Sequence, residues 1–163
     1  MTGSVREATP ADAPQLLALV DALADYEKLP RPAEDARLRL VRDGFGATPR
    51  FHALLAEAGG AAVGYALYFE TYSSFLARPT LYLEDLFVLP AHRTAGHGGR
   101  LFRSVAAEAA RRECGRMEWS VLKWNRLALD FYDRLGAAPL DDWQTYRLDG
   151  AALARAAAGM EAA

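Results

Sequence analysis

A short glycine-rich segment at residues 92–102 has the side chains and the spacing that could hold an anion. It reads His-Arg-Thr-Ala-Gly-His-Gly-Gly-Arg-Leu-Phe, with Arg93-x-x-Gly96-x-Gly98 as its pattern. An apolar, strand-like run precedes the segment and a helical repeat follows it. Such a turn exposes backbone N–H groups, the helix dipole favours negative charge, and Arg93 adds a fixed positive charge. The segment therefore predicts a site for a phosphorylated ligand.

Two familiar phosphate-binding motifs do not fit this segment. A P-loop carries Lys-Ser or Lys-Thr after its last glycine, whereas Gly99 is followed by Arg100-Leu101. A dinucleotide fingerprint needs a third glycine after Gly96-His97-Gly98, and that glycine is missing. A plain connection between a strand and a helix stays open as the alternative for the segment taken alone.

Two adjacent carboxylates, Glu84 and Asp85, interrupt the apolar run 81–88. Successive side chains of a strand point to opposite faces, so one of the two would face the core unless a β-bulge re-aims it. Burial of an unpaired carboxylate is costly, and charges in such a run are typical of functional sites. We interpret the pair as functional; the alternative is a solvated residue on an edge strand.

A second set of candidate residues lies at 124–132. Asn125 suits the N-cap of a helix. Tyr132 is seven residues further on, and two helical turns place it on the same side of that helix. Taken alone, Tyr132 would be interpreted as a half-buried core aromatic.

Composition and charge exclude several classes of protein. Hydrophobic residues make up 52% of the 163 residues, enough for a packed core, and the net charge of −2 gives no footprint for nucleic acid. No apolar run has the length of a membrane span, and no secretory signal is expected. Cys114 is the only cysteine, which agrees with a reducing cytoplasm, and the three histidines lack zinc-site spacing. The excess of arginine over lysine, with abundant alanine, favours a bacterial genome rich in GC.

Periodicity and breakers predict the elements that position these residues. We expect helices at about 9–27, 33–42, 98–113 and 126–135, and strands at 5–8, 51–57, 62–72, 81–89, 117–122 and 142–148. Gly59-Gly60 predicts a hairpin turn, and Thr9, Pro10 and Asp12 are typical of a helix start. Residues 149–163 are expected to form a tail or a short helix. We predict one domain over 1–163, of mixed α/β (α+β) class, around a central sheet.

Several segments, in this order, resemble the GCN5-related N-acetyltransferase (GNAT) superfamily. The resemblance is to its diamine branch, the spermidine/spermine and thialysine N-acetyltransferases. The segments that carry it are Leu81-Tyr82-Leu83-Glu84-Asp85-Leu86-Phe87-Val88, Arg93-x-x-Gly96-x-Gly98, Trp124-Asn125, and Phe131-Tyr132 before Gly136-Ala137, with further matches at 25–27, 43–46 and 64–69. The similarity covers about residues 5–148.

The resemblance implies a GNAT fold: a central, mostly antiparallel sheet with helices on both faces, splayed between the strands at 81–88 and 117–122. Acetyl-CoA would lie in the splay as co-substrate, and no metal is expected. Its pantetheine arm would pair with the first strand, and its diphosphate with the glycine-rich turn. The residues implied for acetyl-CoA are Leu86, Phe87, Val88, Arg93, Thr94, Ala95, Gly96, His97, Gly98, Gly99, Asn125 and Ala128.

The activity implied is transfer of an acetyl group from acetyl-CoA to a primary amine of a small cationic substrate (a diamine, polyamine, thialysine or lysine-like amine) by direct attack. Glu84 would accept the amine proton, and Tyr132 would protonate the leaving thiolate. The residues implied for the substrate are Tyr26, Glu27, Glu84, Asp85, Glu118 and Asp142. An acidic cleft of this kind would concentrate a cation.

One departure from the branch bears on the length of the substrate. Polyamine-acetylating relatives carry Tyr-Asp-Pro-Trp where this chain has Tyr72-Ser73-Ser74-Phe75. The loss of an acid and a tryptophan favours a shorter amine. We also expect a homodimer in the cytoplasm, without nucleic-acid or membrane partners.

Three other functions stay open. The chain could be a non-catalytic acyl-CoA-binding regulatory module, a peptide or protein N-acetyltransferase, or a nucleotide-binding protein unrelated to acetyl transfer. The presence of both Glu84 and Tyr132 disfavours the first of these, and an acidic cleft fits a small cation better than a protein N-terminus.

Overall fold

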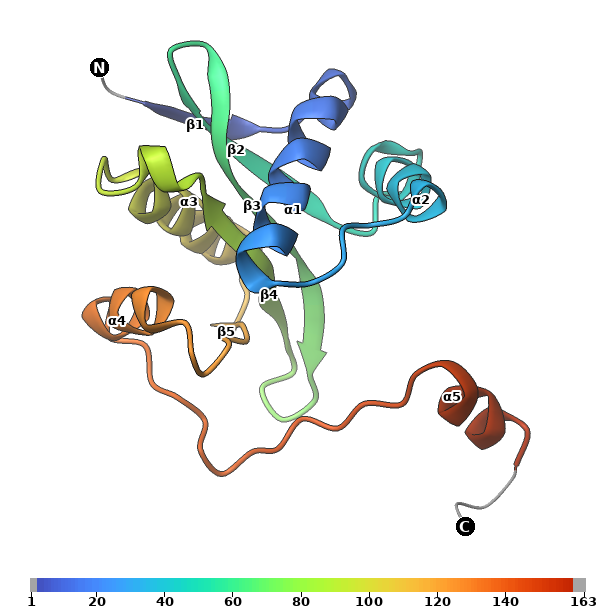
Figure 1. Cartoon of the computed structure of the whole chain (residues 1–163). Helices are drawn as coiled ribbons and strands as arrows, with labels where there is room; N and C mark the ends of the chain where they lie inside the picture. The colour runs from blue at the N-terminus through green and yellow to red at the C-terminus, as the bar shows by residue number, and fades with distance from the viewer. Residues whose placement is uncertain (1–2, 160–163) are drawn as a thin grey trace. The chain divides into compact units, whose positions relative to one another are not determined.

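The computed structural model describes residues 3–159, and the chain forms two compact units, Met1–Ser120 and Val121–Ala163. The first unit is built on a five-stranded sheet in the order β1-β2-β3-β4-β5 (Figure 1). Its strands are β1 (Ser4–Glu7), β2 (His52–Ala58), β3 (Ala61–Ser73), β4 (Arg78–Val88) and β5 (Arg116–Glu118). β1 to β4 are antiparallel neighbours and β5 runs parallel to β4. The predicted mixed fold with a mostly antiparallel sheet is confirmed.

Helices cover both faces of this sheet, as predicted (Figure 1). On one face lie α1 (Ala13–Glu27) and α2 (Glu34–Phe45), and on the other lies α3 (His97–Arg111). Leu16 of α1 packs with Tyr65 and Phe87 of the sheet. On the opposite face, Leu101 of α3 packs with Leu83 and its neighbours. Because successive side chains of a strand point to opposite faces, the strands contribute apolar side chains to the cores on both sides of the sheet.

The start of α1 follows the predicted capping signal with one extra turn. A short 3-10 turn, Pro10–Asp12, precedes the α-helix. The Thr9 amide donates a 2.7 Å hydrogen bond to the Asp12 carboxylate. Arg6 of β1 donates two more bonds to the same carboxylate, of 2.7 and 2.8 Å. This network anchors the first turn of α1 to the edge of the sheet.

A β-bulge interrupts the pairing of β3 with β4 at the acidic pair. The register pairs Leu67 with Asp85 and Tyr68 with Leu83, which leaves Glu84 as the extra residue. Leu83 faces α3 before the bulge, and Phe87 faces α1 after it. Strict alternation would put Asp85 on the same face as Leu83. The bulge turns Asp85 to the α1 face instead.

β4 and β5 are paired only at one end. Their register joins Thr80, Leu81 and Tyr82 to Arg116, Met117 and Glu118. Beyond Tyr82, the edge of β4 away from β3 has no strand beside it within residues 3–159. The strand expected at 117–122 is therefore wrong in length, because it ends at Glu118. An apolar pattern marks a segment that is able to pair, whereas a strand also needs a hydrogen-bonded neighbour.

The second unit contains α4 (Arg126–Arg134) and α5 (Gly150–Ala157). The strand expected at 142–148 is wrong, since residues 143–149 have no regular structure. Aromatic residues alternate there as in a strand, but within its described residues this unit holds no other strand to supply hydrogen bonds. A tail or a short helix was expected over residues 149–163, and residues 150–157 form the short helix α5. The same expectation for 160–163 lies outside the described residues.

Candidate active site

The glycine-rich segment forms the turn between β4 and α3. Gly96 caps α3 with a left-handed backbone, φ +79°, which favours glycine. Thr94 is also left-handed, φ +68°, which is rare for a β-branched residue and typical of functional turns. Within residues 3–159, no amide of 94–99 donates to a backbone carbonyl. These N–H groups, at the N-terminus of a helix, are therefore available to an anion.

Arg93 braces the base of this turn. Its Nε donates a 3.0 Å hydrogen bond to the Val88 carbonyl at the end of β4. Its guanidinium lies 4.6 Å from the centre of the Tyr26 ring and 5.7 Å from that of Phe87. No carboxylate among the described residues pairs with it. The turn thus has an uncompensated positive charge beside its free amides.

His97 differs from its predicted neighbours in the turn, because its ring is buried at 5% exposure. Arg100 lies 3.1 Å from the ring Nδ1 and donates a 3.1 Å bond to the Ala95 carbonyl. Burial, followed by the charge of Arg100, lowers the pKa of His97. The neutral ring packs inward, so the backbone N–H is the group that His97 offers to a ligand. Through these two contacts, Arg100 links Ala95 in the turn to His97, the first residue of α3.

The two adjacent carboxylates of β4 lie in different environments, one in solvent and one on the α1 face of the sheet. Glu84 is exposed in the bulge, whereas Asp85 is partly buried. The hydroxyl of Tyr65, a fully buried residue of β3, donates a 3.0 Å hydrogen bond to Asp85 Oδ2. Burial raises the pKa of Asp85 to about 6, while the Tyr65 bond acts in the opposite direction. Sequence reasoning missed Tyr65, since it reads as an ordinary strand aromatic in an apolar run.

The C-terminal end of α1 brings two more predicted residues to this face. The Tyr26 ring lies 6.1 Å from the Phe87 ring, at a tilt of 49°. Glu27 is the last residue of the helix, and burial raises the pKa of its carboxyl. Glu27 and Asp85 are close enough for the charge of Glu27 to raise the pKa of Asp85. Tyr26, Glu27, Asp85 and Phe87 therefore form one neighbourhood in the first unit.

Glu118 belongs to the neighbouring strand, β5. It is the last residue of β5, in register with Tyr82. Its carboxylate accepts an ion pair of 2.9 Å from Arg116. Part of its negative charge is therefore compensated within β5.

The remaining predicted residues belong to the second unit. Asn125 caps α4, as the sequence predicts, and its side chain accepts a 3.2 Å hydrogen bond from the Ala128 amide. Tyr132 lies two turns along the same helix, and burial raises the pKa of its phenol to about 12. The phenol is thus protonated at neutral pH. Asp142 is exposed and outside any helix or strand.

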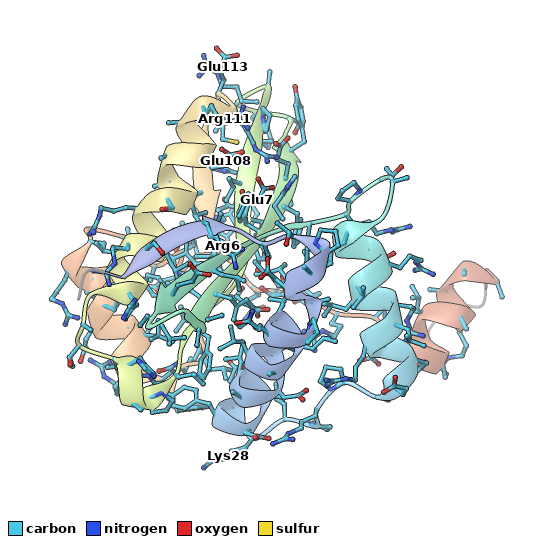
Figure 2. All side chains as sticks on the ribbon, turned by 90° about the horizontal axis from the view of Figure 1, so that it is seen from above. Arg6, Glu7, Lys28, Glu108, Arg111 and Glu113 are labelled. Atoms are coloured by element: carbon cyan, nitrogen blue, oxygen red, sulfur yellow. The ribbon has the colours of Figure 1, made fainter. Side chains whose placement is uncertain are left out.

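A groove of about 470 Å³ lies elsewhere, between β1, β2 and α3. Figure 2 shows Arg6 and Glu7 on β1, and Glu108 and Arg111 on α3. It is lined by Val5, Arg6, Glu7, His52, Leu54, Tyr68, Ser104, Glu108, Arg111 and Arg112, none of which is a predicted site residue. Each arginine that lines it is ion-paired: Arg6 with Asp12 and Glu57, and Arg111 and Arg112 with Glu108. It therefore offers no uncompensated arginine to a diphosphate, in contrast to the turn at Arg93.

This geometry is that of a known family. A glycine-rich anion turn follows a strand whose outer edge is open, and a carboxylate pair lies in a bulge of the same strand. The model of the Acetyltransferase (GNAT) family matches residues 16–137. The chain belongs to this family, and it is an N-acetyltransferase that acts on an amine. Acetyltransferases of the GNAT fold use acetyl-CoA.

Individual relatives agree with this assignment. The chain is 38% identical over 160 residues to the thialysine N-epsilon-acetyltransferase of Bos taurus, covering 91% of this chain and 94% of the relative. An integron cassette protein from V. cholerae has a similar structure, with a TM-score of 0.83, 23% identity and coverage of 96% and 98%. The structure of AAC(6')-Iy in complex with a CoA bisubstrate analogue gives a TM-score of 0.75 at 20% identity, with coverage of 92% and 100%. These two structures support the fold.

The turn fits the diphosphate of acetyl-CoA on its own geometry. In the part of the chain that the structure describes, no backbone carbonyl accepts from its amides and no carboxylate pairs with Arg93. A Cβ on Gly98 would meet only Val88 Cγ2, at 3.9 Å. The absence of a side chain at Gly98 thus leaves room for a ligand rather than for a protein neighbour. Among residues 3–159, no group of three or more His, Cys, Asp or Glu side chains could hold a metal ion. In the same part of the chain, no helix combines the length and apolar character that crossing a membrane requires.

Proposed function

We propose that the chain acetylates a primary amine of a small cationic substrate, such as thialysine, ornithine, lysine or a short diamine. The observation that carries this proposal is the acidic neighbourhood on the α1 face. There Glu27 and Asp85 lie close together with no cation paired to Asp85 in the described residues, and Glu84 is exposed beside them. Such a site attracts an ammonium group. The similarity to thialysine N-epsilon-acetyltransferase supports the same substrate class.

A short acceptor fits the β3–β4 hairpin better than a long polyamine. Ser73 takes the position at which the polyamine-acetylating relatives carry an acid. Its side chain is buried, and the hydroxyl accepts a 3.2 Å hydrogen bond from the Leu76 amide. Ser73 therefore serves the turn of the hairpin and offers no negative charge to a second or third amine.

The proposed binding of acetyl-CoA uses backbone groups in the first unit. The amides of residues 94–99 would hold the diphosphate, with Arg93 as the positive charge beside them. The open edge of β4 would pair with the pantetheine arm through Leu86, Phe87 and Val88, although the Val88 carbonyl already accepts the Arg93 bond. Acetyl-CoA supplies an activated acetyl thioester when bound. From the second unit, Asn125, Ala128 and Tyr132 are proposed at its thiol end.

The proposed reaction is direct attack of the amine on the thioester, with protons moved by side chains. A lysine-like amine has a pKa near 10.4, so it must lose a proton before it can attack. One of the two β4 carboxylates takes that proton. The resemblance to the diamine branch supports Glu84, and its partly buried position beside Tyr65 supports Asp85 as the second candidate. Tyr132, whose phenol is protonated at neutral pH, is proposed to give a proton to the leaving thiolate.

An amine panel tests the proposal. Thiol release from acetyl-CoA is followed with thialysine, ornithine, lysine, diamines, spermidine and peptides with free N-termini. We expect turnover on the short cationic amines, with acetylated product equal to thiol released. Turnover on peptides alone would support a protein N-acetyltransferase, and binding of acetyl-CoA without turnover on any amine would support a regulatory module.

Several further properties belong to the same proposal. We propose one functional domain over residues 1–163, a homodimer and a cytoplasmic location in a bacterium, with neither nucleic acid nor membrane as partner. The net charge of −2 supports the absence of a nucleic-acid partner. Sedimentation equilibrium tests the homodimer, which predicts twice the chain mass of 17.8 kDa.

A further inference from the structure

Two neighbouring carboxylates on β4 have opposite environments. Glu84 is the extra residue of the β-bulge and is exposed. Asp85 is turned to the α1 face, where the buried Tyr65 hydroxyl holds its Oδ2 at 3.0 Å. Within residues 3–159, its Oδ1 receives no hydrogen bond. Asp85 therefore has one oxygen fixed by the protein and one oxygen open to a substrate.

The groups that face Asp85 are neutral or negative. β3 contributes the Tyr65 hydroxyl, α1 contributes the Glu27 carboxylate, and β4 itself contributes Glu84. No arginine or lysine of the described residues forms an ion pair with Asp85. A partly buried carboxylate without a cation costs stability, so packing alone does not explain its presence. A cationic substrate would supply the missing partner.

We propose that Asp85 accepts the proton of the acceptor amine, and that Tyr65 is a positioning residue that holds Asp85 for this step. This inference rests on the proposed function. The bound ammonium gives one proton to Asp85 Oδ1, and the neutral nitrogen then forms the C–N bond to the acetyl carbon. The nitrogen loses its second proton as the amide forms, and that proton replaces the one that Tyr132 gives to the thiolate. The C–S bond breaks, and its electron pair leaves with the sulfur of coenzyme A. No oxidant, reductant or metal is needed for the balance.

The environment of Asp85 makes it a stronger base than an ordinary carboxylate. Burial, with a smaller contribution from Glu84 and Glu27, raises the pKa of Asp85 to about 6. Relative to an ordinary aspartate near 3.9, this is about 100-fold greater proton affinity. Glu84 is exposed in the bulge, and we assign it the role of attracting the cation.

The test is the pH dependence of kcat/KM in three variants of the full chain. In wild type, kcat/KM should fall as the pH drops below about 6, because Asp85 is then protonated; this fall is the acidic limb of the profile. Tyr65→Phe removes a bond that favours the charged form, so the limb should move up by up to about one pH unit. Glu84→Gln removes a neighbouring negative charge, so the limb should move down. Asp85→Asn should lose the limb and about 100-fold or more in kcat.

A matched control separates the role of Tyr65 from packing. Tyr68 is the neighbouring buried tyrosine of β3, and it contacts α3 rather than α1. Tyr68→Phe should leave the acidic limb where it is in wild type. A limb that moves equally in Tyr65→Phe and Tyr68→Phe would overturn the positioning role.

A second readout does not depend on turnover. The Asp85 carboxyl carbon is titrated by NMR in free wild type and in Tyr65→Phe. We expect a pKa near 6 that rises in the variant. An ordinary carboxyl titration in wild type would overturn the inference.

The outcomes also separate this inference from the proposed function. Loss of the limb in Glu84→Gln, with the limb kept in Asp85→Asn, would assign the proton to Glu84 and leave the proposed function intact. Failure of wild type to acetylate any cationic amine would instead overturn the proposed function, and the inference with it.

Discussion

The guanidinium of Arg93 lies 4.6 Å from the centre of the Tyr26 ring, while its Nε is bonded to the Val88 carbonyl. One side chain thereby joins the anion-binding turn to the end of β4 and to the C-terminal end of α1. Arg93 therefore contacts residues proposed to bind acetyl-CoA as well as residues proposed to bind the amine.

These contacts predict that Arg93→Leu affects both substrates. The variant loses the positive charge beside the turn and the contact that positions Tyr26. We expect KM to rise about tenfold for acetyl-CoA, equivalent to about 1.4 kcal/mol, and to rise also for the amine. Initial rates with each substrate varied in turn provide the measurement. Arg39→Ala, which removes an exposed, ion-paired arginine of α2, is the control. A rise in the acetyl-CoA KM alone would show that Tyr26 does not depend on Arg93.

The two glycines of the motif predict different results. Gly98 has an unstrained backbone, and an added Cβ meets only Val88 Cγ2 at 3.9 Å, so Gly98→Val should fold normally. Its side chain would block the diphosphate, and we expect at least a tenfold rise in the acetyl-CoA KM. Gly96, with φ +79°, should lose stability as well when changed to Val. Thermal unfolding and calorimetric titration with coenzyme A distinguish the two. Wild-type affinity in Gly98→Val would exclude the diphosphate from this turn.

Asp85 should lower the stability of the protein at neutral pH. Its pKa is raised from 3.8 to about 6, so the folded state binds a proton more tightly than the unfolded state does. The free energy of unfolding therefore falls as pH rises from about 4 to above 6, by up to about 3 kcal/mol. Asp85→Asn is free of this cost and should be more stable than wild type at pH 7, with the advantage lost by pH 4. Urea unfolding at both pH values measures it, and an equal advantage at both would argue against a raised pKa.

Tyr132→Phe should separate binding from chemistry. The change removes one hydroxyl from α4 and leaves the ring, so we expect KM for both substrates to be kept. Without a proton donor for the thiolate, kcat should fall about 100-fold. Steady-state rates at saturating substrates measure this. The neighbouring Phe131 offers a control in Phe131→Leu, which alters an aromatic of the same helix but removes no proton donor. A wild-type kcat in Tyr132→Phe would remove the phenol from the reaction.

Local signals in the sequence predicted the helices of the first unit and its strands β1 to β4. The hairpin at Gly59-Gly60 is confirmed, because glycines supply the two left-handed residues that the turn requires. The capping residues Thr9 and Asp12 are confirmed for a similar reason, since a cap is a contact between neighbours in the chain. The turn 94–99 was also visible, from its glycines and the strand and helix beside it.

Pairing between distant segments was less visible in the sequence. The short β5 and the missing strand at 142–148 depend on which backbone lies beside them, and an alternating pattern does not specify a neighbour. The same limit applies to the acidic pair. The sequence indicated that either Glu84 or Asp85 would face the core unless a bulge re-aimed it. The register of β3 decides which of them turns inward, and Tyr65 becomes relevant only then.

A crystal structure of the protein with coenzyme A tests the proposed site most directly. We predict diphosphate oxygens at about 3 Å from the amides of residues 94–99, with the pantetheine arm along the open edge of β4. Coenzyme A bound in another part of the molecule, with those amides facing solvent, would contradict the assignment of this turn and of the chemistry built on it.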